Sequence, residues 1–480
     1  MYSLFMGRTS VVAHLPISVS KSAPESLPQQ IVAQIRSAIG KGALVGRDTL
    51  PSSRSLANSL GISRGSVVSA YEQLQAEGYL ETIPGGLTRV RTDIEVYHPD
   101  MQGRSELGTF RGVNEPVAGL SLEPGQPYEG SLANAKWRSA WRKGVELSTI
   151  SSLPRALTEH LRHMRSVVVP AANVMVTSGA RDGLATILHA FSLVKKRPAR
   201  VGFESPGNPH LRAVAKILGH VPVPVGVDEA GPRVNLLDSC ELDLLVVTPS
   251  HLYPAGASMP ASRRFALLEW ARARGVLIVE DDYDSELRHV SAPLPALAAL
   301  DSGDDPHVIL LGTFSTLLTP KMSAGWLSAP ARLFDVLAKV RNKIGNPVSS
   351  ITSQALADLI ETGELARHTR RMRRLYRTRS VALEECLSQV PGVRILAQAS
   401  GLNVALTSSS YPEGVLVERC AKAGLRVRGL HEYWGSASWH VGLMLGVGAL
   451  SNADYVRALD RLALACSDAS EQVLARCANH

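Results

Sequence analysis

The sequence predicts a multidomain chain in which a small helical module precedes a larger α/β domain. A chain of 480 residues is too long for one ordinary hydrophobic core. From about residue 27 to residue 90, the apolar residues follow short helical patterns. From about residue 131 onwards, apolar runs alternate with helical patterns, as is typical of a parallel sheet covered by helices. We therefore expect at least two domains, with a small α+β subdomain at the end of the second.

The composition is that of a globular protein and restricts its environment. Charged residues make up 20% of the chain and hydrophobic residues 45%. The net charge of +8 is compatible with a polyanionic partner but does not require one. The five cysteines lack the spacing of metal ligands and suit a reducing compartment. The sequence shows no signal peptide and no 18-residue apolar run, so we expect a cytoplasmic protein without a membrane partner or a metal site.

The N-terminal module has the pattern of two short helices joined by a glycine turn. Ser52 or Ser53 can cap one helix that Gly61 ends. Ser63 can cap the next helix, which Gly78 ends. This arrangement predicts a helix-turn-helix, in which the start of the second helix faces the major groove of DNA. On spacing alone, a small helical domain with ordinary surface arginines remains an alternative.

Arginine and small polar residues occupy the positions that would face DNA. An arginine can reach a guanine edge, and hydroxyls or a glycine permit close approach. The candidate contacts on the two helices are Arg54, Ser63, Arg64, Gly65 and Ser66. The stretch "YLETIPGGLTRV" then predicts a two-stranded wing turned by Gly85 and Gly86, with Arg89 and Arg91 on its return strand. We expect these cations on the DNA side and the acidic residues Glu72, Glu77 and Glu81 toward the far end.

The stretch "LPSSRSLANSLGISRGSVVSAYEQLQAEGYL" resembles the winged helix-turn-helix of the GntR family over about 65 residues. The resemblance implies a DNA-binding domain over residues 15–92. It implies DNA contacts by the five helix residues above, by the wing glycines and by Arg89. Residues 93–130 are rich in Gly, Pro and polar residues, so we expect a linker there.

The larger domain shows five apolar runs with helical stretches between them, for example residues 263–274. The predicted strands are 174–176, 200–203, 242–247, 276–279 and 308–311. After about residue 335 the pattern becomes helical, with a small α+β segment at the end. The carboxyl ends of parallel strands converge on one crevice, which is the usual place for a ligand.

Polar residues follow several of these strands. The turn 178–181 precedes a helix, where backbone N–H groups can hold a phosphate. Asp281 could hold a pyridinium nitrogen, and Tyr283 could bond a phenolic oxygen. His251 and Tyr253 follow another buried strand. Each segment alone could equally be an ordinary turn or helix cap.

Together, "VTPSHLYPAG", "EDDYDSELRH", "LGTFS" and "HTRRMRRLYRTR" resemble the fold-type I, pyridoxal-phosphate-dependent aminotransferases. A GntR-type DNA-binding domain fused to that fold defines the MocR (GabR-like) subfamily of bacterial regulators. The resemblance implies an effector-binding and dimerising domain over residues 131–480, with a small subdomain at 335–480. The implied cofactor contacts are Ser178, Gly179, Ala180, Arg181, His251, Tyr253, Asp281, Tyr283 and Ser315.

The chain departs from this family at the positions that serve the chemistry. Thr316 follows "GTFS", where the family has the lysine that forms a Schiff base with the cofactor. Ser323 replaces an arginine for the cofactor phosphate, and Asn208 replaces an aromatic residue near the ring. Leu252 replaces a glutamine, and Met444 stands where aminotransferases often bind the substrate carboxylate with arginine. A "YGDPAG"-like stretch is missing before "LPRALTEHLR". Lys321 lies five residues past Thr316, and because Pro320 disfavours a regular helix between them, we expect its amine in solvent.

The resemblance implies a homodimeric transcriptional regulator that binds an operator in double-stranded DNA and a small-molecule effector, and the departures predict that it has no catalytic residues. One alternative is a regulator that binds pyridoxal phosphate, either non-covalently or through Lys321. The other is an active aminotransferase. The basic segment 368–379 is expected to be a solvated helix face that partly contacts the dimer partner, with Met372, Leu375 and Tyr376 as its apolar stripe.

Overall fold

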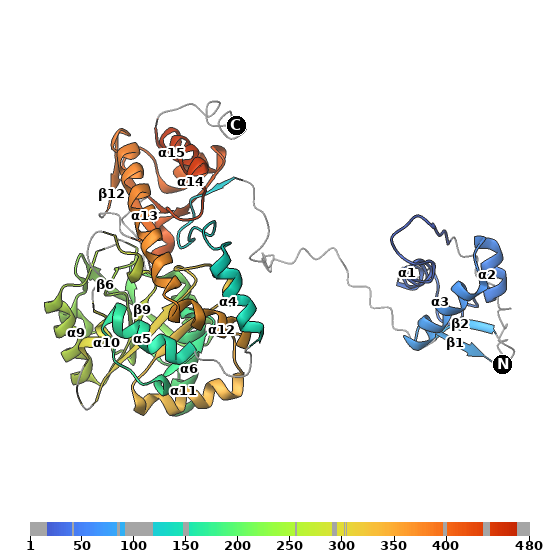
Figure 1. Cartoon of the computed structure of the whole chain (residues 1–480), viewed down its shortest axis with the longest axis horizontal. Coiled ribbons are helices and arrows are strands. Elements are labelled where there is room, and N and C mark those ends of the chain that lie inside the picture. Colours follow the sequence, from blue (N-terminus) through green and yellow to red (C-terminus); the bar gives the residue numbers. More distant parts are fainter. Residues whose placement is uncertain are drawn as a thin grey trace, which may run out of the picture. The chain divides into compact units, whose positions relative to one another are not determined.

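The computed structural model describes residues 17–40, 43–83, 87–91, 119–146, 153–254, 257–289, 295–301, 303, 305–396, 401–434 and 442–467. The chain divides into two compact units, Met1–Arg111 and Gly112–His480. Each unit is a body with its own hydrophobic core (Figure 1).

The first unit consists of three helices and a two-stranded hairpin. Its elements are α1 (Leu27–Gly40), α2 (Ser53–Leu60), α3 (Arg64–Ala76), β1 (Leu80–Ile83) and β2 (Leu87–Val90). Both predicted caps are confirmed. The hydroxyl of Ser52 accepts from the backbone N–H of Ser55 at 3.1 Å, and Ser63 accepts from Ser66 at 3.2 Å. Gly61 ends α2 in the left-handed conformation, with φ 63°.

The core of the first unit joins its three helices. Ile31, Ile35 and Ile39 of α1 are buried against Val67 and Leu74 of α3. These positions recur every three to four residues along each helix, so one face of each helix turns inward. The helix-turn-helix pair therefore keeps its outer surface for a partner.

The second unit is built around an eight-stranded sheet with the order β4-β11-β10-β9-β8-β5-β6-β7. Its strands are β4 (Val174–Thr177), β5 (Arg200–Ser205), β6 (Val221–Asp228), β7 (Gly231–Pro232), β8 (Leu244–Val247), β9 (Leu277–Asp282), β10 (Val308–Thr313) and β11 (Gly325–Ser328). The five predicted strands are confirmed. The sheet is mixed rather than wholly parallel, because β11 pairs antiparallel with β10 and β4, and β7 antiparallel with β6. The segment between β10 and β11 is too short for a parallel crossover.

Helices cover both faces of this sheet. Successive residues of β8 point to opposite faces, and each packs against a different set of helices. Leu244 packs with α6 (Ala180–Lys195), α7 (Pro209–Ile217) and α11 (Ala331–Ile344). Leu245 instead packs with α8 (Val234–Leu237), α9 (Ala261–Arg274) and α10 (Leu297–Leu300). Helix α5 (Leu153–Arg165) belongs to a further core that extends into the C-terminal region. With both faces covered, the ends of the strands are left for a site.

The C-terminal region adds a four-stranded sheet and a long helix. The sheet order is β12 (Val393–Ile395), β13 (Asn403–Ser408), β16 (Gly442–Gly446) and β15 (Arg428–Gly429). The helices are α12 (Ser350–Glu361), α13 (Glu364–Ser388), α14 (Glu413–Lys422) and α15 (Asn452–Cys466). Helix α13 reaches from the central sheet to this small sheet and its helices (Figure 1).

The end of the expected linker packs against this C-terminal region. Strand β3 (Leu120–Ser121) pairs with β14 (Leu425–Arg426), and Glu123 forms ion pairs with Arg426 and Arg428. Helix α4 (Ala135–Glu146) packs on α12. Residues 119–130 are therefore part of the second unit in the structure. None of the helices described is long and apolar enough to cross a membrane.

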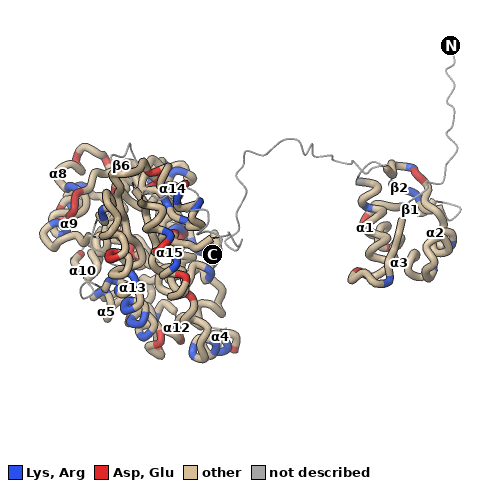
Figure 2. Tube along the Cα trace, turned by 90° about the horizontal axis from the view of Figure 1, so that it is seen from above, with Lys and Arg blue, Asp and Glu red and all other residues tan. Residues whose placement is uncertain are grey.

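The basic segment forms part of α13, where the predicted apolar stripe is confirmed. Met372 and Tyr376 are buried, and Leu375 packs against the same core. Exposed arginines occupy the opposite side of this helix, and basic residues are numerous around α13 and α5 (Figure 2). They include Arg367, Arg370, Arg374 and Arg377.

Candidate functional site

The structure brings the candidate DNA contacts together at the starts of α2 and α3. Arg54, Ser63, Arg64 and Gly65 are exposed. The guanidinium of Arg64 donates to the hydroxyl of Ser53 at 3.4 Å, so the two helix starts are adjacent. A Cβ atom added to Gly65 would contact only the Ser63 hydroxyl, at 3.9 Å, which leaves room for close approach of a partner. Gly85 and Gly86 lie outside the described residues.

The expected separation of charges is wrong for the wing. Strands β1 and β2 pair so that Glu81 lies directly opposite Arg89. Their side chains form an ion pair with 2.6 Å between Nε of Arg89 and Oε1 of Glu81. The register of the hairpin places the acid beside the base, a relation that spacing along the chain did not reveal.

In the second unit, the turn between β4 and α6 lies next to the end of β10. Gly179 has φ 115°, and a Cβ atom there would lie 3.5 Å from the hydroxyl of Thr313 and 4.0 Å from that of Ser315. The first N–H groups of α6, from Ala180 and Arg181, begin at this turn. The N–H of Ser178 donates instead to Asp182 at 3.0 Å. The turn is thus adjacent to the hydroxyls of Thr313 and Ser315.

Two buried carboxyl groups lie toward the carboxyl ends of β9 and β5, the two strands on either side of β8. Asp281 of β9 accepts a hydrogen bond of 3.5 Å from the amide of Asn208. Glu204 of β5 accepts from the N–H of Thr248 at 3.1 Å. One oxygen of each carboxyl, Oδ1 of Asp281 and Oε1 of Glu204, has no hydrogen-bond partner among the described residues. Buried polar atoms are normally paired, so both oxygens indicate a place where a ligand donates.

The surroundings of these carboxyls favour their protonated forms. Burial raises the pKa of Asp281 to about 7; the Asn208 amide opposes this, and the charges of Asp282 and Asp284 add to it. Burial also raises the pKa of Glu204 to about 7, against the hydrogen bonds from Thr248. A cationic or strongly donating ligand would supply the partner that these groups lack.

Aromatic rings line the same region. His251 is stacked on Tyr283 with 5.5 Å between ring centroids, and its Nδ1 lies 2.6 Å from Oδ1 of Asp284. Tyr253 contacts the ring of Tyr283 at 5.2 Å and that of Tyr433 at 5.4 Å. The sequence reasoning missed Tyr433, which comes from the C-terminal region. Its signal was the aromatic pair in "HEYWG", which no predicted strand end accounted for.

The two residues weighed for covalent chemistry lie apart. Thr316 is buried, and its hydroxyl donates to the backbone carbonyl of Tyr283. Lys321 is exposed, and its amine lies 2.6 Å from the carboxylate of Glu129. Ser323 is also exposed. Met444 is fully buried in an apolar cluster with Tyr433.

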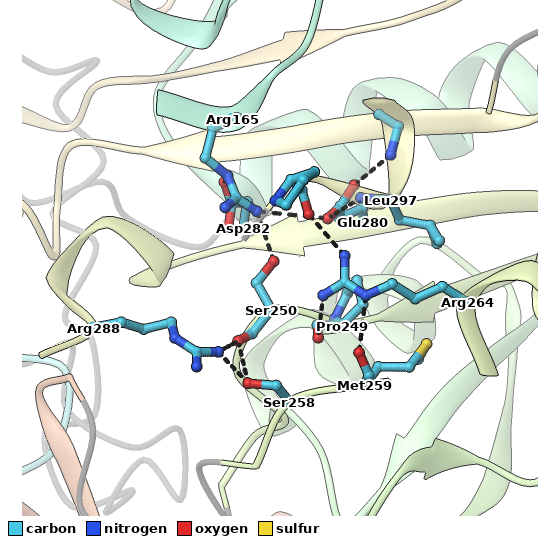
Figure 3. Close-up of polar contacts among 12 residues, drawn as sticks. Arg165, Pro249, Ser250, Ser258, Met259, Arg264, Glu280, Asp282, Arg288 and Leu297 are labelled. Carbon is cyan, nitrogen blue, oxygen red and sulfur yellow. Dashed lines mark hydrogen bonds and ion pairs between the residues drawn. The ribbon is translucent and has the colours of Figure 1, made fainter. Parts of the chain in front are cut away.

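A buried arginine network supports these strand ends (Figure 3). Arg165, at the end of α5, is 1% exposed. Its Nε lies 2.7 Å from Asp282 of β9, and its terminal nitrogen donates to the Ser250 hydroxyl at 2.6 Å. Burial works against the charge of Arg165, but the carboxylates of Asp282 and Glu280 hold its pKa above the ordinary value. Arg288 donates to the carbonyl of Ser250 from the other side. Ser250, the residue before His251, is therefore bonded by Arg165 through its hydroxyl and by Arg288 through its carbonyl.

Comparisons with known proteins agree with this two-part arrangement. Residues 27–90 match the family described as "Bacterial regulatory proteins, gntR family". The HTH-type pyridoxine biosynthesis transcriptional regulator PdxR of Corynebacterium glutamicum is 41% identical over 92% of this chain and 96% of its own. The probable rhizopine catabolism regulatory protein MocR of Rhizobium meliloti is 31% identical over 75% of this chain and 77% of its own.

Among solved structures, an archaeal alanine:glyoxylate aminotransferase superposes with a TM-score of 0.66 and 20% identity, covering 73% of this chain and 91% of its own. The α-aminoadipate aminotransferase LysN of Thermus thermophilus gives 0.65 and 21%, covering 72% and 92%. At such identities the likeness shows the fold. The chain is thus a transcriptional regulator that joins a GntR-type DNA-binding domain to a fold-type I aminotransferase-like domain. It belongs to the MocR subfamily of GntR regulators.

Replacing Arg165 with alanine should strongly destabilise the second unit. The variant leaves Asp282 buried without its cation, a loss that typically costs about 3–5 kcal/mol. The matched control is Arg162→Ala in the same helix, whose ion pair with Glu159 is exposed and should be worth at most about 1 kcal/mol. Denaturant unfolding of both variants measures the difference, and equal losses would contradict the assigned role of the network.

Replacing Asp281 with asparagine should stabilise the ligand-free protein at pH 8 by about 4 kcal/mol, since each of the roughly three units by which its pKa is raised corresponds to about 1.4 kcal/mol. The folded-state pKa of about 7 lies above the ordinary value of 3.8, so the folded state binds this proton more tightly than the unfolded state. Wild-type stability therefore falls as the pH rises from about 4 to about 7, and the variant lacks this part of the loss. Its advantage should vanish near pH 4. Unfolding curves from pH 4 to pH 8 test this, with exposed Asp335→Asn as the control.

Proposed function

We propose that this protein is a sequence-specific regulator in which residues 15–92 read an operator and residues 131–480 bind an effector and form a homodimer. In this proposal the part of the expected linker before residue 119 connects the two, because residues 119–130 belong to the second unit, and residues 335–480 form the small subdomain. A dimer carries two DNA-binding domains, so the operator would contain paired half-sites. The observation that carries the DNA-reading role is the exposed arginine at the start of a capped second helix.

The DNA contacts follow from the geometry of α2 and α3. Arg64 is in the first turn of α3, where a guanidinium can bond a guanine in the major groove. Arg54, in the first turn of α2, can contact a phosphate or a base, and Ser63, Gly65 and Ser66 allow close approach. Arg89 is a weaker candidate, because binding DNA would require it to share or leave Glu81.

Substituting Arg64 with alanine should reduce the preference for operator over random DNA by about 10-fold or more, because a guanidinium–guanine contact contributes about 1–3 kcal/mol of discrimination. Both affinities are measured at one salt concentration, since non-specific binding depends on salt. Lys339→Ala, which removes one exposed cation from the second unit, is the control for net charge. An unchanged ratio for Arg64→Ala would refute the assignment of α3 as the reading helix.

We infer further that the second domain carries out no transamination. In this reading Thr316 occupies the place of the Schiff-base lysine, and a hydroxyl cannot form an imine. The alternatives that use Lys321 require its amine to leave Glu129 and turn inward from the surface. That contact argues against both a Lys321-bound cofactor and an active aminotransferase.

We propose pyridoxal phosphate as a non-covalent effector that binds at these strand ends. Asp281 would hold the ring nitrogen and Tyr283 the phenolic oxygen. The turn at Gly179, Ala180 and Arg181 would hold the phosphate together with Ser315. In enzymes this group supplies an electron sink, whereas here it would serve as a signal. The unpaired oxygen of Asp281 is the supporting observation. The name of the 41% identical relative, a pyridoxine biosynthesis regulator, points to the same ligand class.

Effector binding would change DNA binding by favouring one arrangement of the two DNA-binding domains of the dimer. A ligand shifts such an equilibrium only by its difference in affinity between the arrangements. The strand ends, His251 and Tyr253 and the C-terminal Tyr433 meet around the pocket, so a ligand there contacts both parts of the second unit. This is the route by which occupancy could change the dimer.

Titration with pyridoxal phosphate should give reversible binding with one ligand per chain. Borohydride treatment followed by mass spectrometry should leave no adduct within the pocket, because no amine is available there. Lys321→Ala should bind as the wild type does. A borohydride-trapped adduct on Lys321, lost in that variant, would reject the non-covalent reading.

A further inference from the structure

We propose that the pocket recognises the ring and phosphate of vitamin B6 phosphates without distinguishing the group at the 4′ carbon. The aldehyde, amine and alcohol forms, namely pyridoxal, pyridoxamine and pyridoxine 5′-phosphate, would then bind with similar affinity. The inference rests on the proposed function, since it concerns the ligand class of the same site. It makes the protein a sensor of the total B6 phosphate pool rather than of the reactive aldehyde.

The first support is that no lysine of the second unit is buried. This unit contains nine lysines: Lys136, Lys143, Lys195, Lys196, Lys216, Lys321, Lys339, Lys343 and Lys422. Eight are exposed, and the half-buried Lys422 lies on α14, 3.1 Å from Glu418. An aldehyde is distinguished from an amine or an alcohol chiefly by an amine that can condense with it. With no such amine present, the aldehyde gains no covalent bond.

The second support is the state of Thr316. Its side chain is buried, and its hydroxyl already donates to the carbonyl of Tyr283. That donor is therefore committed to the protein rather than to a ligand. The Thr316 hydroxyl therefore does not distinguish a ligand carbonyl oxygen from an ammonium group.

The third support is that the unpaired acceptor belongs to a part of the ligand that all three forms share. Asp281 is 2% exposed, and its Oδ1 lacks a partner in the described part of the chain. A ring N–H would supply this missing donor, and hydrogen bonds to charged groups are worth about 1.5–3 kcal/mol. The ring nitrogen and the phosphate are the same in the three compounds. The proposed contacts to the ring nitrogen and the phosphate therefore do not depend on the 4′ substituent.

The test is calorimetric titration of the full chain with each of the three compounds, followed by competition between them. We expect dissociation constants within about fivefold of one another and mutual displacement at one ligand per chain. Asp281→Ala should weaken all three in parallel by about 10-fold or more, whereas exposed Asp335→Ala should leave them unchanged.

A gain-of-function variant tests the role of the missing amine. In Thr316→Lys, the new amine condenses with the aldehyde and releases water, and borohydride reduces the resulting C=N bond to a stable amine. We expect an adduct on residue 316 and tighter binding for pyridoxal phosphate alone. If this variant does not fold, the wild-type titrations decide the question.

The outcomes separate the inference from the function on which it rests. If none of the three compounds binds, the proposal of a B6 effector fails and this inference fails with it. If the aldehyde form binds the wild type more than about 10-fold tighter than the other two, the effector proposal stands but the inference is overturned. Parallel loss of all three in Asp281→Ala supports both.

Discussion

The second unit depends on the burial of one charged side chain. Arg165 ends α5, yet it is almost fully enclosed and bonds to Asp282 at the end of β9 and Ser250 after β8. A charge removed from water is tolerated only while its partners stay in place, so the three elements are fixed relative to one another. The residues next to these anchors, Asp281 and His251, are the ones that line the pocket. Rigid support of this kind is what a recognition site requires.

The proposed effector site combines two buried acceptors with a threonine that is bonded within the protein. Asp281 and Glu204 remain buried with unpaired oxygens, which costs folding free energy in the absence of a ligand. A donating ligand offsets that cost, so occupancy and the stability of this region are coupled. Thr316, by contrast, is satisfied within the protein. The unpaired acceptors thus give the proposed site a physical reason to bind a donating ligand.

The DNA-binding unit follows a similar division between supported and available groups. Serine caps fix the starts of α2 and α3, and Arg54 and Arg64 extend from those starts into solvent. Arg89 has the same charge but is paired with Glu81 across the hairpin. Charge counts alone would rank these arginines equally. Their surroundings differ, because Arg64 is exposed whereas Arg89 could bind another group only by sharing or leaving Glu81.

The sequence alone determined what depends on neighbours along the chain. Helix caps at Ser52 and Ser63, the five predicted strands and the turn at Gly179 follow from local hydrogen bonding and side-chain periodicity. Only the tertiary structure decided the antiparallel β11, the Arg89–Glu81 pair, the burial of Arg165 and the entry of Tyr433 into the pocket. Arg165 and Asp282 are 117 residues apart in the chain. The partner of a buried charge or ring is set by how separate elements pack, and no local pattern records that choice.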